Sequence, residues 1–290
     1  MTAEQDLEDR TILITGATTG IGRATAAALA GRGASLILAC RSEERTRPVI
    51  EGLVEASGND RISFVPLDLA ELESVRACAG AVLERDEPLH VLLNNAGLAG
   101  QRGSTPDGFE LAFGTNHLGH FLLTGLLLDR LRASAPARVV TVASHSHYQA
   151  DGIDFEAVRR PTRSLTGMPE YAVSKLANVL FTQELARRTE GEGITTAAVH
   201  PGVIASDIWR RLPWPLRPIA LTFMGSPENG ARASVHCAAD LEPTVRSGLY
   251  HDAAGPRPAS AAATGELAAA LWEHSERWTA PGPDGAEPDP

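Results

Sequence analysis

Tyr171 and Lys175 have the residue types and the spacing that acid–base chemistry requires. They lie four positions apart in the run YAVSK, inside a segment of helical periodicity, so both side chains can face the same side of a helix. A nearby ammonium stabilises a phenolate, which eases proton exchange with a carbonyl or an alcohol near neutral pH. The pair therefore predicts a proton donor and acceptor; a surface pair without a catalytic role is the alternative.

Lys175 is the only lysine among the 26 lysine and arginine residues of the chain. A biased composition that leaves one lysine by accident would also explain this. Its place one helical turn after one of only three tyrosines favours a functional reason. Arginine would not occupy the same space, because its guanidinium is a planar fork and not a compact, flexible ammonium.

A glycine-rich turn, TGATTGIG, follows the first apolar run of the chain. Glycines here allow a tight turn, a close approach of the backbone to a pyrophosphate, and a helix N-terminus that faces the anion. The spacing is GxxxGxG and not GxGxxG, and a purely structural turn is the alternative. The residues expected to bind a dinucleotide are Gly16, Thr18, Thr19, Gly20, Ile21 and Gly22.

The end of the second predicted strand carries Arg41, where an acidic residue would bind the ribose hydroxyl of NAD. A guanidinium suits a 2′-phosphate by charge and by paired hydrogen bonds, so we expect NADP(H) to be preferred over NAD(H). Two alternatives remain. Arg41 could be a solvated residue at a helix start, or Glu43 or Glu44 could reach the ribose.

Two further strand ends fit a nucleotide. Asp68 and Leu69 follow the third strand, where the carboxylate could accept from an adenine amino group; N-capping of a helix that starts near Leu72 is an equal alternative. The fourth strand ends in NNAG, which could also be turn chemistry alone. The residues of this run expected beside the cofactor are Asn95, Ala96 and Gly97.

Short apolar runs alternate with longer helical patterns along the chain, as strands and helices do in α/β proteins. Six strand–helix units predict a doubly wound parallel sheet of the Rossmann type, in a single domain of about seven strands with helices on both faces. The expected strands span Thr11–Thr15, Ser35–Ala39, Arg61–Pro66, Leu89–Leu93, Arg138–Ala143, Ile194–Val199 and Leu249–His251. The expected helices span Ile21–Ala30, Glu43–Ala56, Leu72–Leu83, Phe113–Leu131, Tyr171–Arg188 and Pro227–Ala239.

Two segments interrupt this alternation. Residues 145–170 form an insertion between a strand and the next helix, and residues 203–226 are rich in proline, tryptophan and leucine. Both follow carboxyl ends of strands, where open α/β sheets bind ligands. We expect one domain over residues 1–279 and a disordered tail over residues 280–290.

Charge, cysteine content and hydropathy exclude several classes of protein. The net charge is −10 without a basic stripe, so binding to nucleic acid is not expected. Three cysteines without a CxxC pair argue against a disulfide framework or a zinc site and indicate a reduced, cytoplasmic protein. Neither a signal peptide nor a membrane span is evident. The histidine pairs His117/His120 and His145/His147 lack carboxylates or cysteines at ligand spacing, so no metal site is expected.

The motifs TGATTGIG, NNAG, VVTVAS, YAVSK and HPG resemble, in this order, those of the short-chain dehydrogenase/reductase family in its single-domain form. The resemblance covers residues 11 to about 251. The phrases LACRSEER, TNHLGHFLLT and AVHPGV look closest to the retinol dehydrogenase-like branch and also resemble light-dependent protochlorophyllide reductase.

The resemblance implies roles for four residues. Tyr171 would be the general acid in reduction and the base in oxidation, and Lys175 would bind the nicotinamide ribose and lower the pKa of the tyrosine. Ser144 would hydrogen-bond the substrate carbonyl and stabilise the developing oxyanion, and Asn116 would hold the water of a proton relay. Ala143 departs from the family pattern, in which a serine usually precedes the reacting serine.

The resemblance also implies how the substrate is enclosed. The gap of 27 residues between Ser144 and Tyr171 is longer than in the commonest members, so the insertion is expected to cap the site. Residues 203–226 would form a lid over an apolar substrate, with an amphipathic packing element or a subunit contact as the alternative. Residues expected beside the nicotinamide are Pro201, Gly202 and Val203, and those expected at the substrate are Ser144, His145, Tyr171 and Trp209.

These expectations combine into one predicted function: an NADPH-dependent oxidoreductase that transfers a hydride between the nicotinamide and the carbonyl or alcohol of a fairly apolar aldehyde or ketone, as a ketoreductase or alcohol dehydrogenase does. Two alternatives use the same scaffold: a catalytically silent NADP-binding sensor, and a non-redox dehydratase or epimerase. The expected partner is a small molecule, and the sequence leaves both a homodimer and a monomer open.

Overall fold

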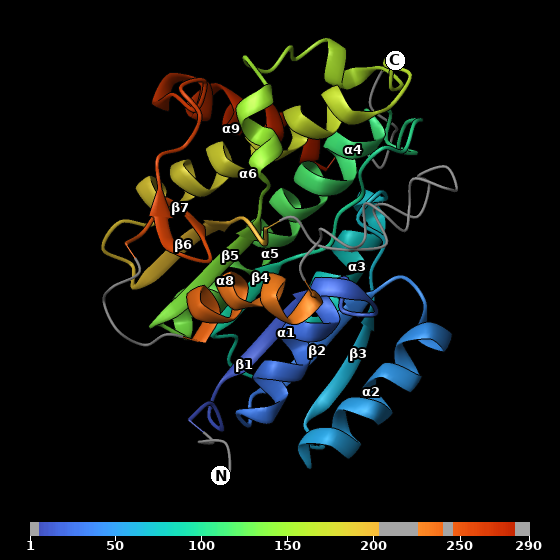
Figure 1. The fold of residues 1–290 in the computed structure, drawn as a ribbon, viewed down its shortest axis with the longest axis vertical. Helices are drawn as coiled ribbons and strands as arrows, with labels where there is room; N and C mark the ends of the chain where they lie inside the picture. Colours follow the sequence, from blue (N-terminus) through green and yellow to red (C-terminus); the bar gives the residue numbers. More distant parts are fainter. Residues whose placement is uncertain (1–5, 203–225, 240–245, 282–290) are drawn as a thin grey trace.

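The computed structural model describes residues 6–202, 226–239 and 246–281. Its centre is an eight-stranded sheet in the order β3-β2-β1-β4-β5-β6-β7-β8 (Figure 1). Seven strands are parallel, and β8 pairs antiparallel with β7. From β1 the chain adds strands toward one edge of the sheet, up to β3, and from β4 onward it adds strands toward the other edge. The doubly wound nucleotide-binding fold has the same reversal, so the predicted fold class is confirmed. The short β8 is an addition to the seven strands expected.

The strands are β1 Thr11–Thr15, β2 Ser35–Cys40, β3 Ile62–Pro66, β4 Val91–Asn94, β5 Ala137–Val142, β6 Ile194–Val199, β7 Leu249–Asp252 and β8 Gly255–Arg257. The principal helices are α1 Gly20–Gly31, α2 Glu43–Ser57, α3 Leu72–Leu83, α5 Gly119–Ala133, α6 Met168–Arg188, α8 Pro227–Ala239 and α9 Gly265–Thr279. Shorter turns are α4 Leu111–Phe113, the π-helical turn Gly114–Leu118, and the 3-10 turns His145–Gln149 and Ala157–Arg159.

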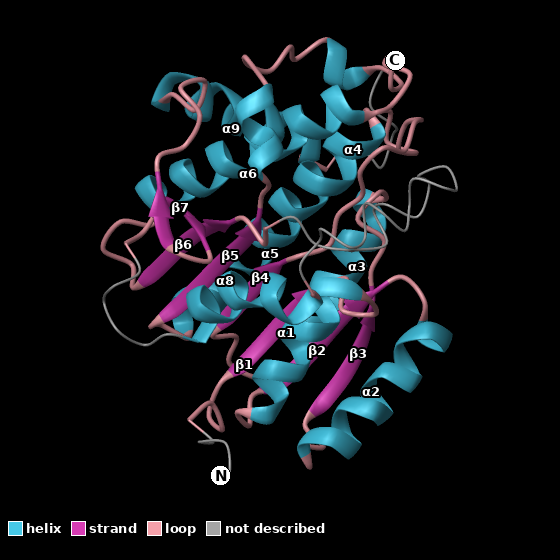
Figure 2. Cartoon of the chain, viewed as in Figure 1, coloured by secondary structure: helices cyan, strands magenta, loops and turns pink. Residues whose placement is uncertain are grey.

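Helices cover both faces of the sheet (Figure 2), which explains why its central strands are mainly apolar. Successive side chains of a strand point to opposite faces. Ile12 and Ile14 of β1 accordingly pack into the core cluster that includes α1, α2 and α8, whereas Leu13 packs into the cluster that includes α3, α5 and α6. All five residues of β1 are buried.

The predicted helix over Phe113–Leu131 is divided in the structure. Three residues of α4 are followed by the π-helical turn and then by α5, which ends at Ala133. A π turn shifts the hydrogen bonds from residue i+4 to residue i+5: the main-chain N–H of Gly119 accordingly donates to the carbonyl of Gly114. Apolar periodicity predicts a helix here but does not reveal such a local change in hydrogen bonding.

The C-terminal helix α9 was not expected from the sequence. It lies against α6 (Figure 1) and buries Ala268 and Leu271 against the Leu176 and Leu180 side of that helix. Its N-cap Thr264 accepts from the main-chain N–H of Leu267. The cap residue Thr264 and the apolar stripe of α9 are both present in the sequence. In the structure α9 packs onto α6, outside the central sheet.

Parallel strands bring their carboxyl ends to one edge of the sheet. The glycine-rich turn follows β1, Arg41 directly follows β2, and Asp68 lies two residues after the end of β3. Asn95 directly follows β4, and Ser144 lies two residues after the end of β5. The fold therefore gathers at a single edge residues that are spread over more than 100 positions of the chain.

Candidate active site

Tyr171 and Lys175 occupy the first turns of α6 and are both buried, with 8% and 3% of their surfaces exposed. The Lys175 Nζ lies 5.7 Å from the centroid of the Tyr171 ring. It donates a hydrogen bond of 2.8 Å to the main-chain carbonyl of Val142, the last residue of β5. The predicted helical pair therefore points inward, and the alternative of a surface pair is wrong.

Ser144 lies two residues beyond this carbonyl, and its hydroxyl is close enough to Tyr171 to affect the pKa of the phenol. Burial raises the pKa of Tyr171, and the Ser144 hydroxyl opposes that rise. Burial also lowers the pKa of Lys175 to about 7. The lowering of the tyrosine pKa that we expected from the ammonium is thus not present in the protein alone, because removal of the phenol from water has the larger effect.

Asn116 lies in the π-helical turn and is completely buried. Its side-chain Oδ1 accepts from the Leu98 N–H at 2.9 Å, and its Nδ2 donates to the Leu98 carbonyl at 3.0 Å. The same Nδ2 donates to the Ser174 Oγ at 2.9 Å, and Ser174 donates to the Tyr171 carbonyl. Asn116 therefore connects the loop after β4 to the helical turn that carries Tyr171 and Lys175.

The glycine-rich turn has the close packing that a dinucleotide site requires. A Cβ on Gly22 would lie 2.4 Å from both the Asn95 Nδ2 and the Gly16 carbonyl oxygen. Gly16 has a φ of +68°, and a Cβ there would lie 2.7 Å from the Ala96 Cβ. Thr19, the N-cap of α1, makes no side-chain cap hydrogen bond, and the first turn carries no acidic residue. The first N–H groups of α1 are thus suited to an anion such as a pyrophosphate.

Asn95 holds this turn in place. Its Nδ2 donates to the Thr15 carbonyl at 2.8 Å and to the Gly16 carbonyl at 3.1 Å. The Thr15 hydroxyl in turn accepts from the main-chain N–H groups of Asn95 and Ala96, each at 2.9 Å. The NNAG run is therefore more than a local turn, because it joins β4 to the glycine-rich turn after β1.

Arg41 and Asp68 lie close together at the ends of β2 and β3, with 4.0 Å between the guanidinium Nη1 and the carboxylate Oδ2. The Arg41 side chain is 74% exposed, and the adjacent Ser42 caps α2 by accepting from the Arg45 N–H. An exposed guanidinium at this edge of the sheet is free to approach a phosphate.

The N-cap alternative for Asp68 is wrong. Its Oδ1 accepts from the Ala70 N–H at 3.0 Å, which is a local turn before the helix. The first N–H of α3, on Leu72, instead donates to the Asp107 Oδ2 at 3.0 Å. The cap thus comes from a residue 35 positions away, which leaves the Asp68 Oδ2 to face Arg41. Leu69 is buried against Gly119 at the start of α5.

The structure describes part of the predicted substrate side. His145 is exposed, and its main-chain N–H donates to the His200 Nδ1 at 3.3 Å. Pro201 and Gly202 follow β6, with a φ of +83° at Gly202. Val203, Trp209 and the remainder of the predicted lid, apart from Ser226, lie outside the described residues.

The histidines of the two sequence pairs serve packing and hydrogen bonding. His117 is fully buried with its Nε2 3.0 Å from the Ser275 Oγ of α9. His147 is also fully buried; its Nδ1 lies 2.7 Å from the Ser144 carbonyl, and its Nε2 accepts from the Ser260 N–H at 3.1 Å. In the part of the chain that the structure describes, no group of three or more potential ligands could hold a metal ion.

Three residues of the site were not identified from the sequence. Ser174 supports Asn116, and the Asn178 Nδ2 donates to the same Val142 carbonyl as Lys175, at 3.1 Å. His120 contacts both Thr15 and the Asn116 carbonyl. Helical spacing could have identified two of them. Asn178 lies one helical turn after Lys175, and His120 lies one helical turn after Asn116.

The chain is similar to known proteins over most of its length. A family model described as short chain dehydrogenase matches residues 10–154. Human retinol dehydrogenase 13 is 41% identical over 278 residues, which are 92% of this chain and 84% of the relative. A putative uncharacterized protein from Mycobacterium paratuberculosis matches with a TM-score of 0.74 and 35% identity, over 96% of this chain and 98% of that one.

A putative short chain dehydrogenase from Shigella flexneri, solved in complex with NADP, matches with a TM-score of 0.66 and 26% identity, over 87% of this chain and 100% of that one. Across the described ranges of this chain, none of the helices has the length and apolar character needed to cross a membrane. The chain belongs to the short-chain dehydrogenase/reductase family, on its retinol dehydrogenase-like branch, and is an NAD(P)-dependent dehydrogenase/reductase.

Proposed function

We propose that this enzyme transfers a hydride between NADP(H) and the carbonyl or alcohol of a fairly apolar aldehyde or ketone, with Tyr171 as the acid and base. The observation that carries this proposal is the meeting of Tyr171, Ser144 and Lys175 at the sheet edge that also holds the glycine-rich turn. A proton donor is thus placed beside a site with the packing that a nucleotide requires.

The chain's own residues divide the work. The bound nicotinamide supplies or accepts the hydride. In reduction, the Tyr171 O–H bond breaks and its proton goes to the carbonyl oxygen of the substrate, while the Ser144 hydroxyl donates a hydrogen bond to the same oxygen. Tyr171 regains a proton from solvent through water held at Asn116. Lys175 holds the nicotinamide ribose, and its charge stabilises the transient phenolate.

Two observations support NADP(H) over NAD(H). The Arg41 guanidinium is exposed at the end of β2, where a 2′-phosphate would lie. The Shigella flexneri neighbour was solved with NADP. The remaining cofactor contacts in this proposal are made by the turn after β1, by Asp68 and Leu69, by the NNAG run, and by Pro201 to Val203.

The substrate class is inferred from the relatives. The name of human retinol dehydrogenase 13 contains retinol, which is an apolar alcohol. We propose a fairly apolar substrate for this chain as well. His145 is exposed next to Ser144, where it can contact such a molecule. We further propose a cytoplasmic location, which the buried cysteines Cys40, Cys78 and Cys237 support, and either a monomer or a homodimer.

A screen of NADPH oxidation with aldehydes, retinoids, steroids and aromatic ketones tests the proposal. Tyr171→Phe should abolish turnover of the substrate that is found and leave NADPH binding largely unchanged. Tyr250→Phe is the matched control, because it removes a buried hydroxyl that has no hydrogen-bond partner among the described residues. Activity retained by Tyr171→Phe would contradict the mechanism, and NADPH binding without turnover of any carbonyl compound would favour the sensor.

A further inference from the structure

His147 is fully buried and lies three residues after Ser144, in the 3-10 turn His145–Gln149. The Nδ1 of its ring lies 2.7 Å from the main-chain carbonyl oxygen of Ser144. The Nε2 lies 3.1 Å from the main-chain nitrogen of Ser260, which is 113 positions further along the chain. A buried imidazole therefore connects Ser144 to the segment between β8 and α9.

The contact with Ser260 determines which ring nitrogen of His147 carries the proton. A main-chain N–H can only donate a hydrogen bond, so the His147 Nε2 accepts from Ser260 and carries no proton. The proton of the neutral ring lies on Nδ1, and His147 accordingly donates to the Ser144 carbonyl.

The surroundings of His147 favour its neutral form. Burial lowers the pKa of the ring from the ordinary 6.5, and the neighbouring His145 acts in the same direction, whereas the bond to the Ser144 carbonyl opposes the shift. The ring contacts those of Tyr148 and Tyr250, with 3.9 and 4.5 Å between centroids. A single tautomer is therefore retained at and above neutral pH.

Both polar groups of Ser144 are held by the turn that follows it. The Ser144 carbonyl accepts from the main-chain N–H of His147 at 3.1 Å as well as from the ring. A carbonyl oxygen has two lone pairs, so His147 supplies a donor for each. The Ser144 Oγ accepts from the Ser146 N–H at 3.2 Å, and its own proton is donated to the Ser146 Oγ at 3.3 Å. This last bond is long, and a substrate oxygen can replace it.

The far side of the His147 ring is anchored on a segment that has hydrogen bonds of its own. The Ser260 carbonyl accepts from the Ala263 N–H at 2.9 Å, and the Tyr148 hydroxyl donates to the Pro258 carbonyl at 2.5 Å. Two hydrogen bonds, from Tyr148 and to His147, thus join the turn after β5 to residues 258–260. The ring is held from one side and holds the Ser144 peptide group on the other.

We propose that His147 is a positioning residue for Ser144, whose Nδ1–H fixes the Ser144 peptide group so that the Ser144 hydroxyl is directed at the substrate oxygen. This inference rests on the proposed function, in which Ser144 stabilises the developing oxyanion. Side-chain rotamers are set relative to the backbone, so a fixed peptide group limits the positions open to Oγ. A displaced hydroxyl loses most in the transition state, where the charge on the substrate oxygen is largest.

Two substitutions separate the two contacts of the His147 ring. The amide nitrogen in His147→Asn has the same place in the side chain as Nδ1 and can still donate to the Ser144 carbonyl, whereas the contact with Ser260 is lost. The amide oxygen in His147→Gln reaches the position of Nε2 and can still accept from Ser260, whereas the donor to Ser144 is lost. Both variants are measured for free energy of unfolding, NADPH affinity, kcat and KM.

Both variants should be less stable than the wild type, because each removes a buried ring, but only one should lose activity. We expect His147→Gln to lower kcat about tenfold, the order of effect that loss of one hydrogen bond produces, with NADPH affinity unchanged. His147→Asn should keep kcat within about threefold of the wild type. Equal losses of kcat in the two variants, a larger loss in His147→Asn, or a fall in NADPH affinity that parallels kcat would overturn the inference.

A double-mutant cycle with Ser144→Ala tests whether His147 acts through Ser144. Single-turnover reduction with enzyme in excess allows the slow Ser144→Ala reaction to be followed. When the Ser144 hydroxyl is absent, its direction no longer matters, so His147→Gln should lower the rate by less than about twofold in this background. A loss of about tenfold in both backgrounds would show that His147 acts on another part of the enzyme.

A further measurement does not depend on activity. In nitrogen-detected NMR of the cofactor-free protein, the His147 signals, assigned by their loss in His147→Asn, should show the Nδ1–H tautomer at about pH 8. A proton on Nε2 would overturn the inference. Failure of the wild type to reduce any carbonyl compound contradicts the proposed function, whereas the tautomer and the variants, compared with an active wild type, test His147 alone.

Discussion

The ammonium of Lys175 donates a hydrogen bond of 2.8 Å to the carbonyl of Val142, and Asn178 donates to the same oxygen at 3.1 Å. A buried cation thus lies at the carboxyl end of β5, with a main-chain oxygen as its hydrogen-bond partner. Its burial lowers its pKa to about 7 from the ordinary 10.5. This arrangement places a charge where the proposed chemistry uses it and makes the stability of the protein depend on pH.

The first prediction concerns Lys175→Met. Between pH 7 and pH 10.5 the unfolded chain binds a proton at Lys175 that the folded protein releases, so the free energy of unfolding of the wild type rises with pH in this window. The thioether of the variant cannot titrate. The stability advantage of the variant should therefore be larger at pH 7 than at pH 9 by about 2–3 kcal/mol, measured by urea unfolding at both pH values. Parallel pH profiles would show that the pKa of Lys175 is not lowered.

The second prediction concerns the packing of the glycine-rich turn. Gly22→Ala forces a Cβ to within 2.4 Å of the Asn95 Nδ2, which should lower the free energy of unfolding by about 2 kcal/mol and weaken NADPH binding. Gly31→Ala is the control, since it lies at the end of the same helix with no atom within 4 Å of the new Cβ. It should be neutral or stabilising by up to about 1 kcal/mol. Equal unfolding midpoints for the two variants would contradict the close approach.

The third prediction concerns cofactor choice. Arg41→Asp removes the exposed guanidinium and places a second carboxylate near Asp68, so the ratio of kcat/KM for NADPH to that for NADH should fall about 10- to 100-fold. Arg47→Asp makes the same change of charge on the exposed face of α2 and should leave the ratio close to that of the wild type. An unchanged ratio in Arg41→Asp would rule out Arg41 as the residue that selects the cofactor.

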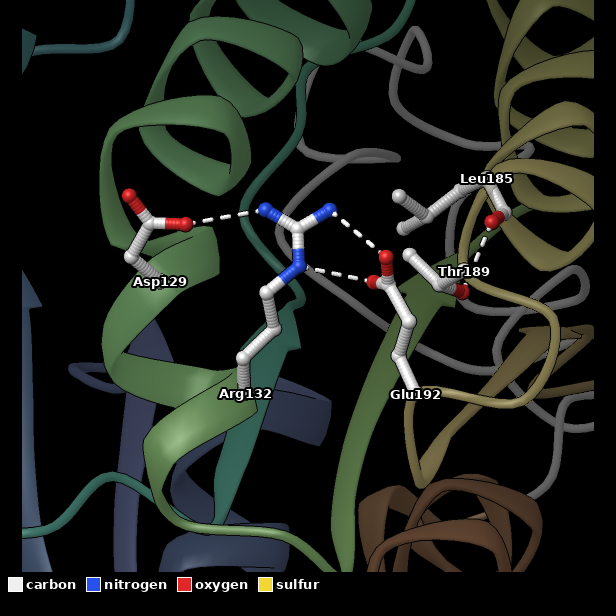
Figure 3. A network of polar contacts seen from close by, with 5 residues as sticks. All are labelled: Asp129, Arg132, Leu185, Thr189 and Glu192. Carbon is white, nitrogen blue, oxygen red and sulfur yellow. Dashed lines mark hydrogen bonds and ion pairs between the residues drawn. The ribbon is translucent and has the colours of Figure 1, made fainter.

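The fourth prediction concerns an ion pair far from the site. The Arg132 guanidinium bonds both carboxylate oxygens of Glu192 at 2.7 and 3.2 Å, and it also contacts Asp129 (Figure 3). Because Arg132 is 39% exposed and Glu192 34%, we expect a coupling energy of only about 0.5–1 kcal/mol in a double-mutant cycle of Arg132→Ala and Glu192→Ala. It should shrink in 0.5 M salt, as screening of about 10 Å range at 0.1 M implies. A salt-independent coupling above this range would show that the pair behaves as a buried one.

The sequence alone determined those features that neighbouring residues encode. Alternation of apolar runs with helical periods predicted the doubly wound sheet, and the spacing of Tyr171 and Lys175 predicted a shared helical face. The sheet and the shared helical face could be predicted because the backbone geometry of strands and helices repeats every few residues. The spacing of apolar and polar residues along the chain follows that repeat.

The tertiary structure decided the hydrogen bonds between residues far apart in the sequence and the effects of burial on pKa values. Asp107 caps α3 in place of Asp68, and Asn116 contacts Ser174, 58 positions away. The pKa of Tyr171 is raised where an effect of Lys175 suggested a lower one. No local pattern could reveal these facts, because a side chain's hydrogen-bond partners and its loss of contact with water are fixed only when the elements pack together.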